Sequence, residues 1–226
     1  MSNDVPPPVP PDPQPRVIPW ELPGVPLVSG LIDTVKLVAM SPRIAFSRVP
    51  VNPEFVRPLL YAVILGTVGA LFDYIYNAAF GDLVSRFVPT GGNADADLGG
   101  LAWMQGKTIF MVVVMPLIIT VTLFLGSAIT HLFLMLVGGN NRGYFATFRA
   151  SAYSGTANVA YLIPVCGSLI AFVWHIVLAV IGVATLHDTS TGKAALAVLL
   201  PMVLLCICLL VGVFVMGATL FGLGQG

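Results

Sequence analysis

Long runs of apolar residues dominate the chain between residues 58 and 220. Five stretches of this region are long enough to cross a bilayer core, which is about 30 Å thick and needs roughly 20 helical residues. Polar and turn-forming residues separate the stretches. The pattern predicts five membrane-spanning helices, at about residues 58–80, 107–136, 146–164, 165–186 and 194–220.

The chain before the first span has a different pattern. Residues 1–17 are rich in proline and have no apolar core, so we expect a disordered, solvated tail and not a signal peptide. Within residues 18–57, apolar positions recur at helical spacing beside charged ones, in stretches too short and too charged to span. We therefore predict amphipathic helices on the membrane surface, and a cytosolic helical hairpin is the alternative. The predicted membrane anchors are Trp20, Leu31, Ile32, Val35 and Phe46.

Composition supports this assignment. The chain is 57% hydrophobic and 9% charged, its mean hydropathy is +0.94, and its formal net charge is zero. A soluble domain has roughly a quarter of its residues charged, and a nucleic-acid-binding protein is normally basic. We predict an all-α membrane protein, a five-transmembrane-helix bundle with N-terminal amphipathic interfacial helices and no nucleic-acid partner.

Basic residues predict the orientation. Of the ten lysines and arginines, two fall on the side of the loop after the first span, Arg86 and Lys107. The other eight fall on the N-terminal side: Arg16, Lys36, Arg43, Arg48, Arg57, Arg142, Arg149 and Lys193. Because lysine and arginine concentrate in cytoplasmic segments, we expect a cytoplasmic N-terminus and an external C-terminus.

The third predicted span carries a series of polar residues that lipid would not tolerate on an exposed face. At about 100° per residue they fall within roughly 80° of one another on a helix. Such a stripe must face other helices or a hydrated cavity, and the sequence leaves both interpretations open. The stripe consists of Thr147, Ser151, Ser154, Asn158 and Tyr161.

Two further polar residues complete the candidate intramembrane cluster. If the third and fourth spans meet at residues 164–167, His175 lies level with Ser154, so we expect its imidazole to reach Ser154 or Asn158 directly or through one water. A neutral packing imidazole and a proton-carrying group both remain open. Asp73, in the first span, is either a buried carboxylate or a marker of the outer interface.

No pattern in the sequence predicts catalysis. Motifs for zinc proteases, serine hydrolases and phosphate-binding loops do not occur, so we expect no catalytic residue, no metal site and no cofactor. We expect the three cysteines to be small packing residues.

Several segments resemble the Yip family of polytopic membrane proteins, its bacterial members in particular. They are PWE at residues 19–21, GGNNRGYFATFRASAYS at residues 138–154 and the stretch at residues 163–194 that begins IPVCGSLIAF. The resemblance implies five transmembrane helices, a cytoplasmic N-terminus and a bacterial inner membrane. Eukaryotic relatives act in vesicle traffic and bind Rab-type GTPases, but this chain lacks their DLYGP-type motif, so that role is not transferred.

Three functional hypotheses follow, and the third, an intramembrane enzyme, is disfavoured because the sequence offers no nucleophile with a base. The leading one is a non-enzymatic integral membrane protein that organises membrane or interacts with lipid, with a membrane-protein partner or with further copies of itself. The alternative is a transporter or channel for a small solute, ion or lipid that uses the polar stripe on the third span.

Overall fold

The computed structural model describes residues 17–87 and 109–223, and these residues form helices and connecting segments without strands. Residues 1–16 of the predicted tail, the first two residues of the predicted second span and residues 224–226 lie outside this part. The elements, in chain order, are η1 (Pro19–Glu21), α1 (Leu27–Met40), α2 (Pro42–Ser47), α3 (Val56–Phe87), α4 (Ile109–Leu136), α5 (Gly143–Ser154), η3 (Gly155–Leu162), α6 (Gly167–Leu186) and α7 (Thr191–Leu223).

Four helices of the described chain are long and apolar enough to cross a membrane: α3 over Val56–Tyr76, α4 over Val113–Leu136, α6 over Gly167–Leu186 and α7 over Thr191–Val215. These match four of the five predicted spans. The remaining prediction, residues 146–164, falls on α5 and η3, and neither element is long enough to span by itself. The prediction of an all-α membrane protein is confirmed. By length and hydropathy, the described residues contain four candidate spans where five were predicted.

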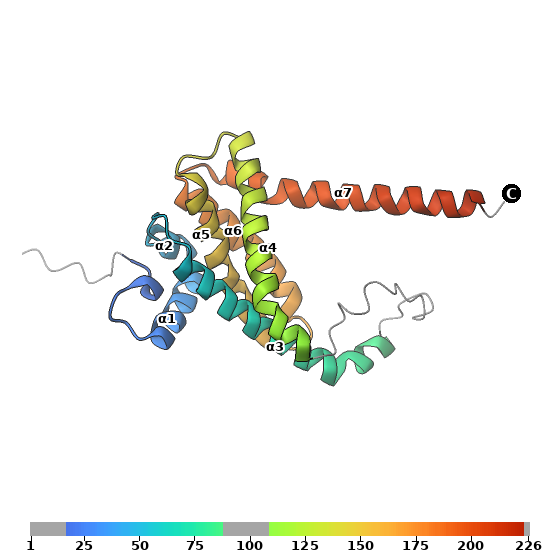
Figure 1. Cartoon of the computed structure of the whole chain (residues 1–226), viewed down its shortest axis with the longest axis horizontal. Coiled ribbons are helices and arrows are strands. Elements are labelled where there is room, and N and C mark those ends of the chain that lie inside the picture. The colour runs from blue at the N-terminus through green and yellow to red at the C-terminus, as the bar shows by residue number, and fades with distance from the viewer. Residues whose placement is uncertain (1–16, 88–108, 224–226) are drawn as a thin grey trace, which may run out of the picture.

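The α5–η3 segment lies at the centre of the bundle. Every residue from Ala146 to Ala157 is buried except Ser151. Helices α3, α4 and α6 pack around this segment, with α3 and α6 on η3 and with α4 and α6 on α5 (Figure 1). The small residues of α5 allow this close packing, because alanine, serine and glycine let helix backbones approach one another.

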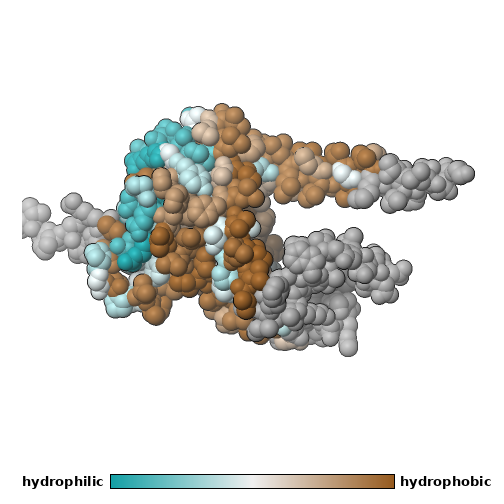
Figure 2. All heavy atoms as spheres, viewed as in Figure 1, coloured by the Kyte–Doolittle hydropathy of each residue, from teal (hydrophilic) through white to brown (hydrophobic). Residues whose placement is uncertain are grey.

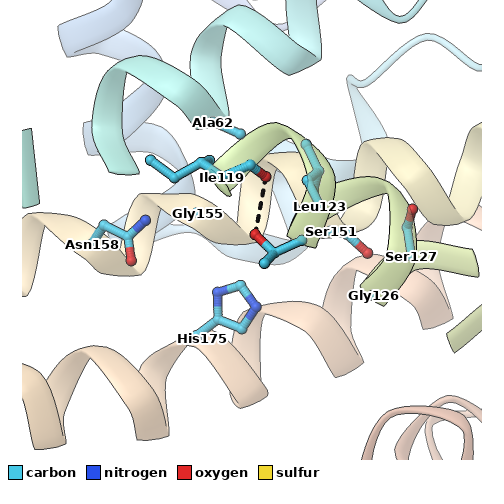
Figure 3. A pocket seen from close by; sticks show the side chains of 10 residues that line it. Ala62, Ile119, Leu123, Gly126, Ser127, Ser151, Gly155, Asn158 and His175 are labelled. Atoms are coloured by element: carbon cyan, nitrogen blue, oxygen red, sulfur yellow. Dashed lines mark hydrogen bonds between the residues drawn. The ribbon is translucent and has the colours of Figure 1, made fainter. Parts of the chain in front are cut away.

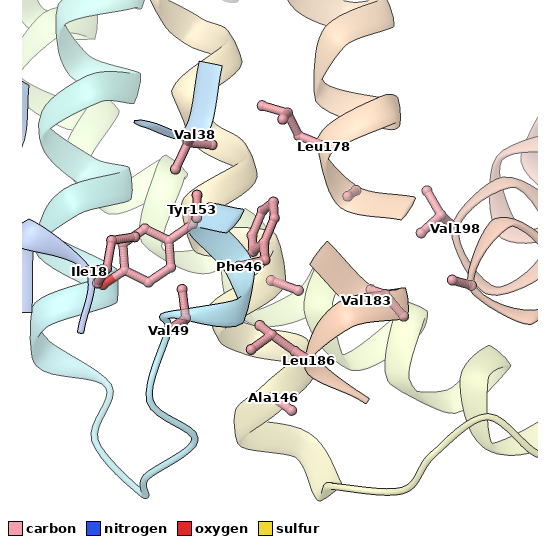
Figure 4. Close-up of a cluster of buried hydrophobic side chains, with 14 of the residues drawn as sticks. Ile18, Val38, Phe46, Val49, Ala146, Tyr153, Leu178, Val183, Leu186 and Val198 are labelled. Carbon is pink, nitrogen blue, oxygen red and sulfur yellow. The ribbon is translucent and has the colours of Figure 1, made fainter. Parts of the chain in front are cut away.

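The N-terminal elements pack onto the bundle. Helix α2 lies against α6, where the Phe46 ring occupies the space beside Gly182, and Ile18, Val38 and Tyr153 belong to the same buried cluster (Figure 4). A Cβ atom at Gly182 would lie 2.8 Å from the Phe46 ring, so this glycine forms the notch that receives the phenylalanine.

The prediction that Trp20 and Phe46 anchor the chain in lipid is wrong. Trp20 is only 4% exposed and Phe46 is fully buried, so both side chains contact protein and have no surface left for lipid. The indole nitrogen of Trp20 donates a 2.7 Å hydrogen bond to the Arg57 carbonyl at the start of α3, which explains its inward orientation. Of the other three predicted anchors, Ile32 is exposed, whereas Leu31 and Val35 are half-buried.

Helix α7 extends away from the bundle (Figure 1). Its first turns contact α4 and α6 through Ala194, Ala197 and Val198, which are buried. Beyond them the large apolar residues from Val203 to Val215 are all exposed. Figure 2 shows this apolar surface continuing over α4, while hydrophilic residues gather on the left of the view, where α5 begins and α2 lies.

Candidate functional site

Three polar assemblies are built around the α5–η3 segment, and the first joins it to the N-terminal elements. The side chain of Arg149, in the middle of α5, is 0% exposed and its Nη1 lies 2.6 Å from Oε1 of Glu21, which is 5% exposed. Its Nη2 donates to the Asn52 side chain and, at 3.1 Å, to the Glu54 carbonyl, while the Tyr153 hydroxyl donates to Glu21. We call these five residues the Arg149 network.

The Arg149 network fixes the N-terminal elements in place. A buried charge is tolerated only when it is paired and hydrogen-bonded, and Arg149 and Glu21 fulfil this condition for each other. Nearby, the Trp20 backbone N–H donates to Thr34 Oγ1 at 2.8 Å, and Arg57 donates to the Trp20 carbonyl at 3.1 Å. Polar bonds therefore hold η1 against α1, α3 and α5.

The second assembly is a pair of histidines that share one threonine hydroxyl. Thr147 Oγ1 lies 2.8 Å from His131 Nδ1 of α4 and 2.8 Å from His187 Nε2 at the end of α6. The Arg142 backbone N–H donates to His187 Nδ1 at 3.4 Å, so the neutral imidazole carries its proton on Nε2 and donates to Thr147. Burial, with the nearby His131 and Arg142, lowers the pKa of His187 to about 4. This histidine is therefore uncharged at neutral pH and ties three helix ends together.

The third assembly is a cavity of about 310 Å³ between α3, α4, the α5–η3 segment and α6 (Figure 3). Ser151 and Asn158 line it from the α5–η3 segment, His175 lines it from α6, and Thr122 and Ser127 line it from α4. The His175 imidazole lies near the backbone of Ser154. The predicted partner Ser154 thus lies near the histidine, but its hydroxyl donates to the Ala150 carbonyl.

The residues of the predicted polar stripe do not share one environment, because they face the histidine pair, the cavity and α3. Thr147 belongs to the histidine pair, and Ser151 and Asn158 face the cavity. Tyr161 packs against Gly69 of α3. The side chain of Asp73 is exposed in the part of the chain that the structure describes.

The change of winding at Gly155 explains the division. An α-helix turns by about 100° per residue and a 3₁₀-helix by about 120°, so by Tyr161 the predicted direction is wrong by about 140°. The sequence offered no clear signal for an eight-residue 3₁₀ segment, which is unusually long for this type of helix.

Neither the Arg149 network nor the pairing of His131 with His187 was predicted from the sequence. A signal for the first was present, because an arginine inside a predicted span requires a buried partner, and Glu21 is one of few carboxylates near the N-terminal elements. No comparable signal marks His187, since its position follows from the folding of two connections onto each other. Within the described residues, no three potential ligands are grouped as a metal site.

The fold and its apolar surface define an all-helical integral membrane protein. A family model described as "Yip1 domain" matches residues 36–221, which is most of the chain, and the protein belongs to this family. The resemblance seen in the sequence is thereby confirmed at the level of the family. Comparisons with curated proteins and with solved structures found no match.

Proposed function

We propose that this chain is a non-enzymatic membrane protein with five crossings that organises the membrane, or a lipid or protein partner, through its docked N-terminal helices. Its setting is a bacterial inner membrane, with the N-terminus in the cytoplasm. The observation that carries the proposal is the surface of α1, one side of which is fixed to the bundle while a second side presents bare apolar residues.

Helix α1 has three distinct sides. Gly30, Thr34 and Val38 lie one turn apart and face the bundle. At about 100° per residue, an apolar exposed side lies next to them and contains Val28, Ile32 and Ala39. A polar exposed side follows, with Ser29, Asp33 and Lys36. A helix at the boundary of protein, lipid and water needs these three kinds of surface.

The central segment supplies the fifth crossing. With 12 residues in α5 and 8 in η3, it extends roughly 34 Å at 1.5 Å per α-helical and 2.0 Å per 3₁₀ residue. This length is enough for a bilayer core of about 30 Å. Protein surrounds the segment on most sides, so it can carry polar residues and a less regular winding that lipid would not tolerate.

A non-enzymatic role agrees with the arrangement of the cavity. Ser151 and His175 both line it, but in the described part of the chain no hydrogen bond joins them. A serine nucleophile needs a base within hydrogen-bonding reach and a group that orients that base. The pair does not form this arrangement.

The five-crossing topology predicts the labelling of Cys166, which is exposed between η3 and α6. With Cys206 and Cys208 changed to serine, an impermeant maleimide should label Cys166 in intact spheroplasts. A matched variant with Cys166→Ser and Ser190→Cys should be labelled only after permeabilisation, because Ser190 precedes α7 on the other side. Labelling of Ser190→Cys without permeabilisation, or of Cys166 only with it, would contradict the topology.

The exposed apolar side of α1 can be tested with the variant Val28→Ser/Ile32→Ser/Ala39→Ser in liposomes. We expect amide hydrogen exchange in α1 to accelerate by about tenfold and any change of vesicle size caused by the protein to disappear, because the helix loses its lipid contact. The thermal unfolding temperature should stay nearly constant, since these side chains are exposed. The matched control is Ser29→Ala/Asp33→Asn/Lys36→Gln on the polar side, which should behave as wild type. Unchanged exchange in the serine variant would show that the side is not in lipid.

The alternative of a transporter or channel is favoured by one observation, the polar cavity beside His175. A continuous path along the stripe receives less support, because Thr147 is engaged with two histidines and Tyr161 faces α3. We therefore keep membrane organisation as the leading function.

A further inference from the structure

The cavity beside His175 contains hydrogen-bonding groups that the protein itself does not use. Neither the Ser151 hydroxyl nor the Asn158 amide is bonded to another residue in the described part of the chain, and both line the cavity. The His175 imidazole lines the same cavity, near the backbone of Ser154. A polar group within the hydrocarbon region needs a hydrogen-bond partner, so these three side chains require water or a ligand there.

The cavity opens toward the hydrocarbon. His175 lies on the same face of α6 as the buried residues Ala171, Leu178 and Gly182, but its own side chain is exposed. The cavity therefore connects this side chain with the surface of the bundle. Across from it, Thr122 and Gly126 of α4 are exposed as well. The surfaces beside this opening are apolar and exposed: Ile118, Leu125 and Ile129 on α4, and Phe172 on α6. An opening with such a border leads into lipid and not into water.

The chemistry of the lining selects an uncharged ligand. The ten residues that line the cavity include no aspartate, glutamate, lysine or arginine. A phosphate or ammonium group would be buried there without a counter-charge, which is strongly unfavourable. A hydroxyl, an amide and an imidazole nitrogen can instead both donate to and accept from the hydroxyl groups of a polyol.

The size of the cavity selects a head group and not a whole lipid. A volume of about 310 Å³ lies at the lower end of ligand pockets, and one water occupies about 30 Å³. A glycerol-sized head therefore fits inside, while acyl chains must remain outside, where α4 and α6 offer apolar surface.

From these observations we propose that the cavity binds the uncharged hydroxyl-bearing head of a diacylglycerol-type lipid, which enters from the bilayer between α4 and α6. Ser151, Asn158 and His175 bind the hydroxyl groups, and the acyl chains lie along the exposed apolar surfaces of the two helices. This site is separate from the exposed side of α1, so it goes beyond the proposed organising function and does not depend on it.

The test uses the full-length protein in nanodiscs and a diacylglycerol with a diazirine in one acyl chain as the probe. We expect saturable cross-linking to peptides of α4 and α6, competed by unlabelled dioleoylglycerol at least tenfold better than by dioleoylphosphatidylglycerol or dioleoylphosphatidylethanolamine. Gly126→Leu should reduce cross-linking about tenfold by filling the opening, because a Cβ at Gly126 points into open space. Gly212→Leu on α7 is the matched control, since a Cβ there also meets nothing within 4 Å, and it should label within twofold of wild type.

A second variant tests the polar groups separately. Ser151→Ala/Asn158→Leu should lower cross-linking about tenfold without closing the opening, and a thermal unfolding temperature close to that of wild type shows that the variant is folded. Equal labelling of Gly126→Leu and wild type, or equal competition by the charged lipids, would overturn the proposal. Displacement of the probe by millimolar free glycerol would overturn its lipid part, because a water-soluble polyol would then be the occupant. None of these results changes the hydrogen-exchange test of α1, so the two proposals can fail independently.

Discussion

Replacing Arg149 with methionine is expected to lower the free energy of unfolding by about 3–5 kcal/mol, because it leaves the Glu21 carboxylate buried without its counter-charge. The same change removes the donors to Asn52 and to the Glu54 carbonyl. The N-terminal elements should therefore come away from the bundle while the membrane-spanning helices remain folded. Unfolding in mixed micelles measures the first effect, and limited proteolysis within residues 18–57 measures the second.

The double variant Glu21→Gln/Arg149→Met separates the charge from the packing. With both charges removed, no uncompensated ion is buried, so the double variant should be more stable than Arg149→Met alone. Glu21→Gln alone should also be destabilising, since it leaves the guanidinium without a carboxylate. If the effects of the two single changes simply add in the double variant, the ion pair does not couple the two segments and the proposed role of the network is refuted.

The Arg149 network also shows why the N-terminal elements were only partly predictable. Helical spacing predicted short helices within residues 18–57, where α1 and α2 lie, but periodicity cannot distinguish a side that faces lipid from a side that faces protein. Phe46 is buried because Gly182, more than a hundred residues later, leaves space for its ring. Trp20 points inward because the Arg57 carbonyl accepts its N–H. Such long-range fits are not encoded in any local pattern.

The spanning helices were predictable for the opposite reason. In lipid, a helix must satisfy its own backbone hydrogen bonds and present apolar side chains, so length and hydropathy alone identify α3, α4, α6 and α7. The α5–η3 segment is shielded by its neighbours and escapes this constraint. For that reason its polar residues were visible in the sequence, whereas its change of winding and the grouping of Ser151 with Asn158 and His175 were not.

The contact between η3 and α6 carries the second large prediction. A Cβ atom at Gly167 would lie 2.4 Å from the Ala160 carbonyl oxygen and 3.2 Å from its carbonyl carbon. These are backbone atoms, so no side-chain rotation relieves the overlap and the two segments must separate. Gly167→Ala should therefore lower the free energy of unfolding by about 2–3 kcal/mol, in the range of overpacked cores, although alanine is the better helix former.

The matched control for this change is Gly212→Ala in α7, where an added Cβ meets nothing within 4 Å. It should be neutral or stabilising by up to about 1 kcal/mol, because it gains helix propensity without a steric cost. Both variants are compared with wild type by unfolding in mixed micelles. Separation of η3 from α6 also moves Asn158 away from His175, so Gly167→Ala should lose diacylglycerol cross-linking although every residue that lines the cavity is unchanged. Equal stabilities of the two variants would mean that η3 and α6 do not approach as closely as described here, and the placement of the cavity between them would then be wrong.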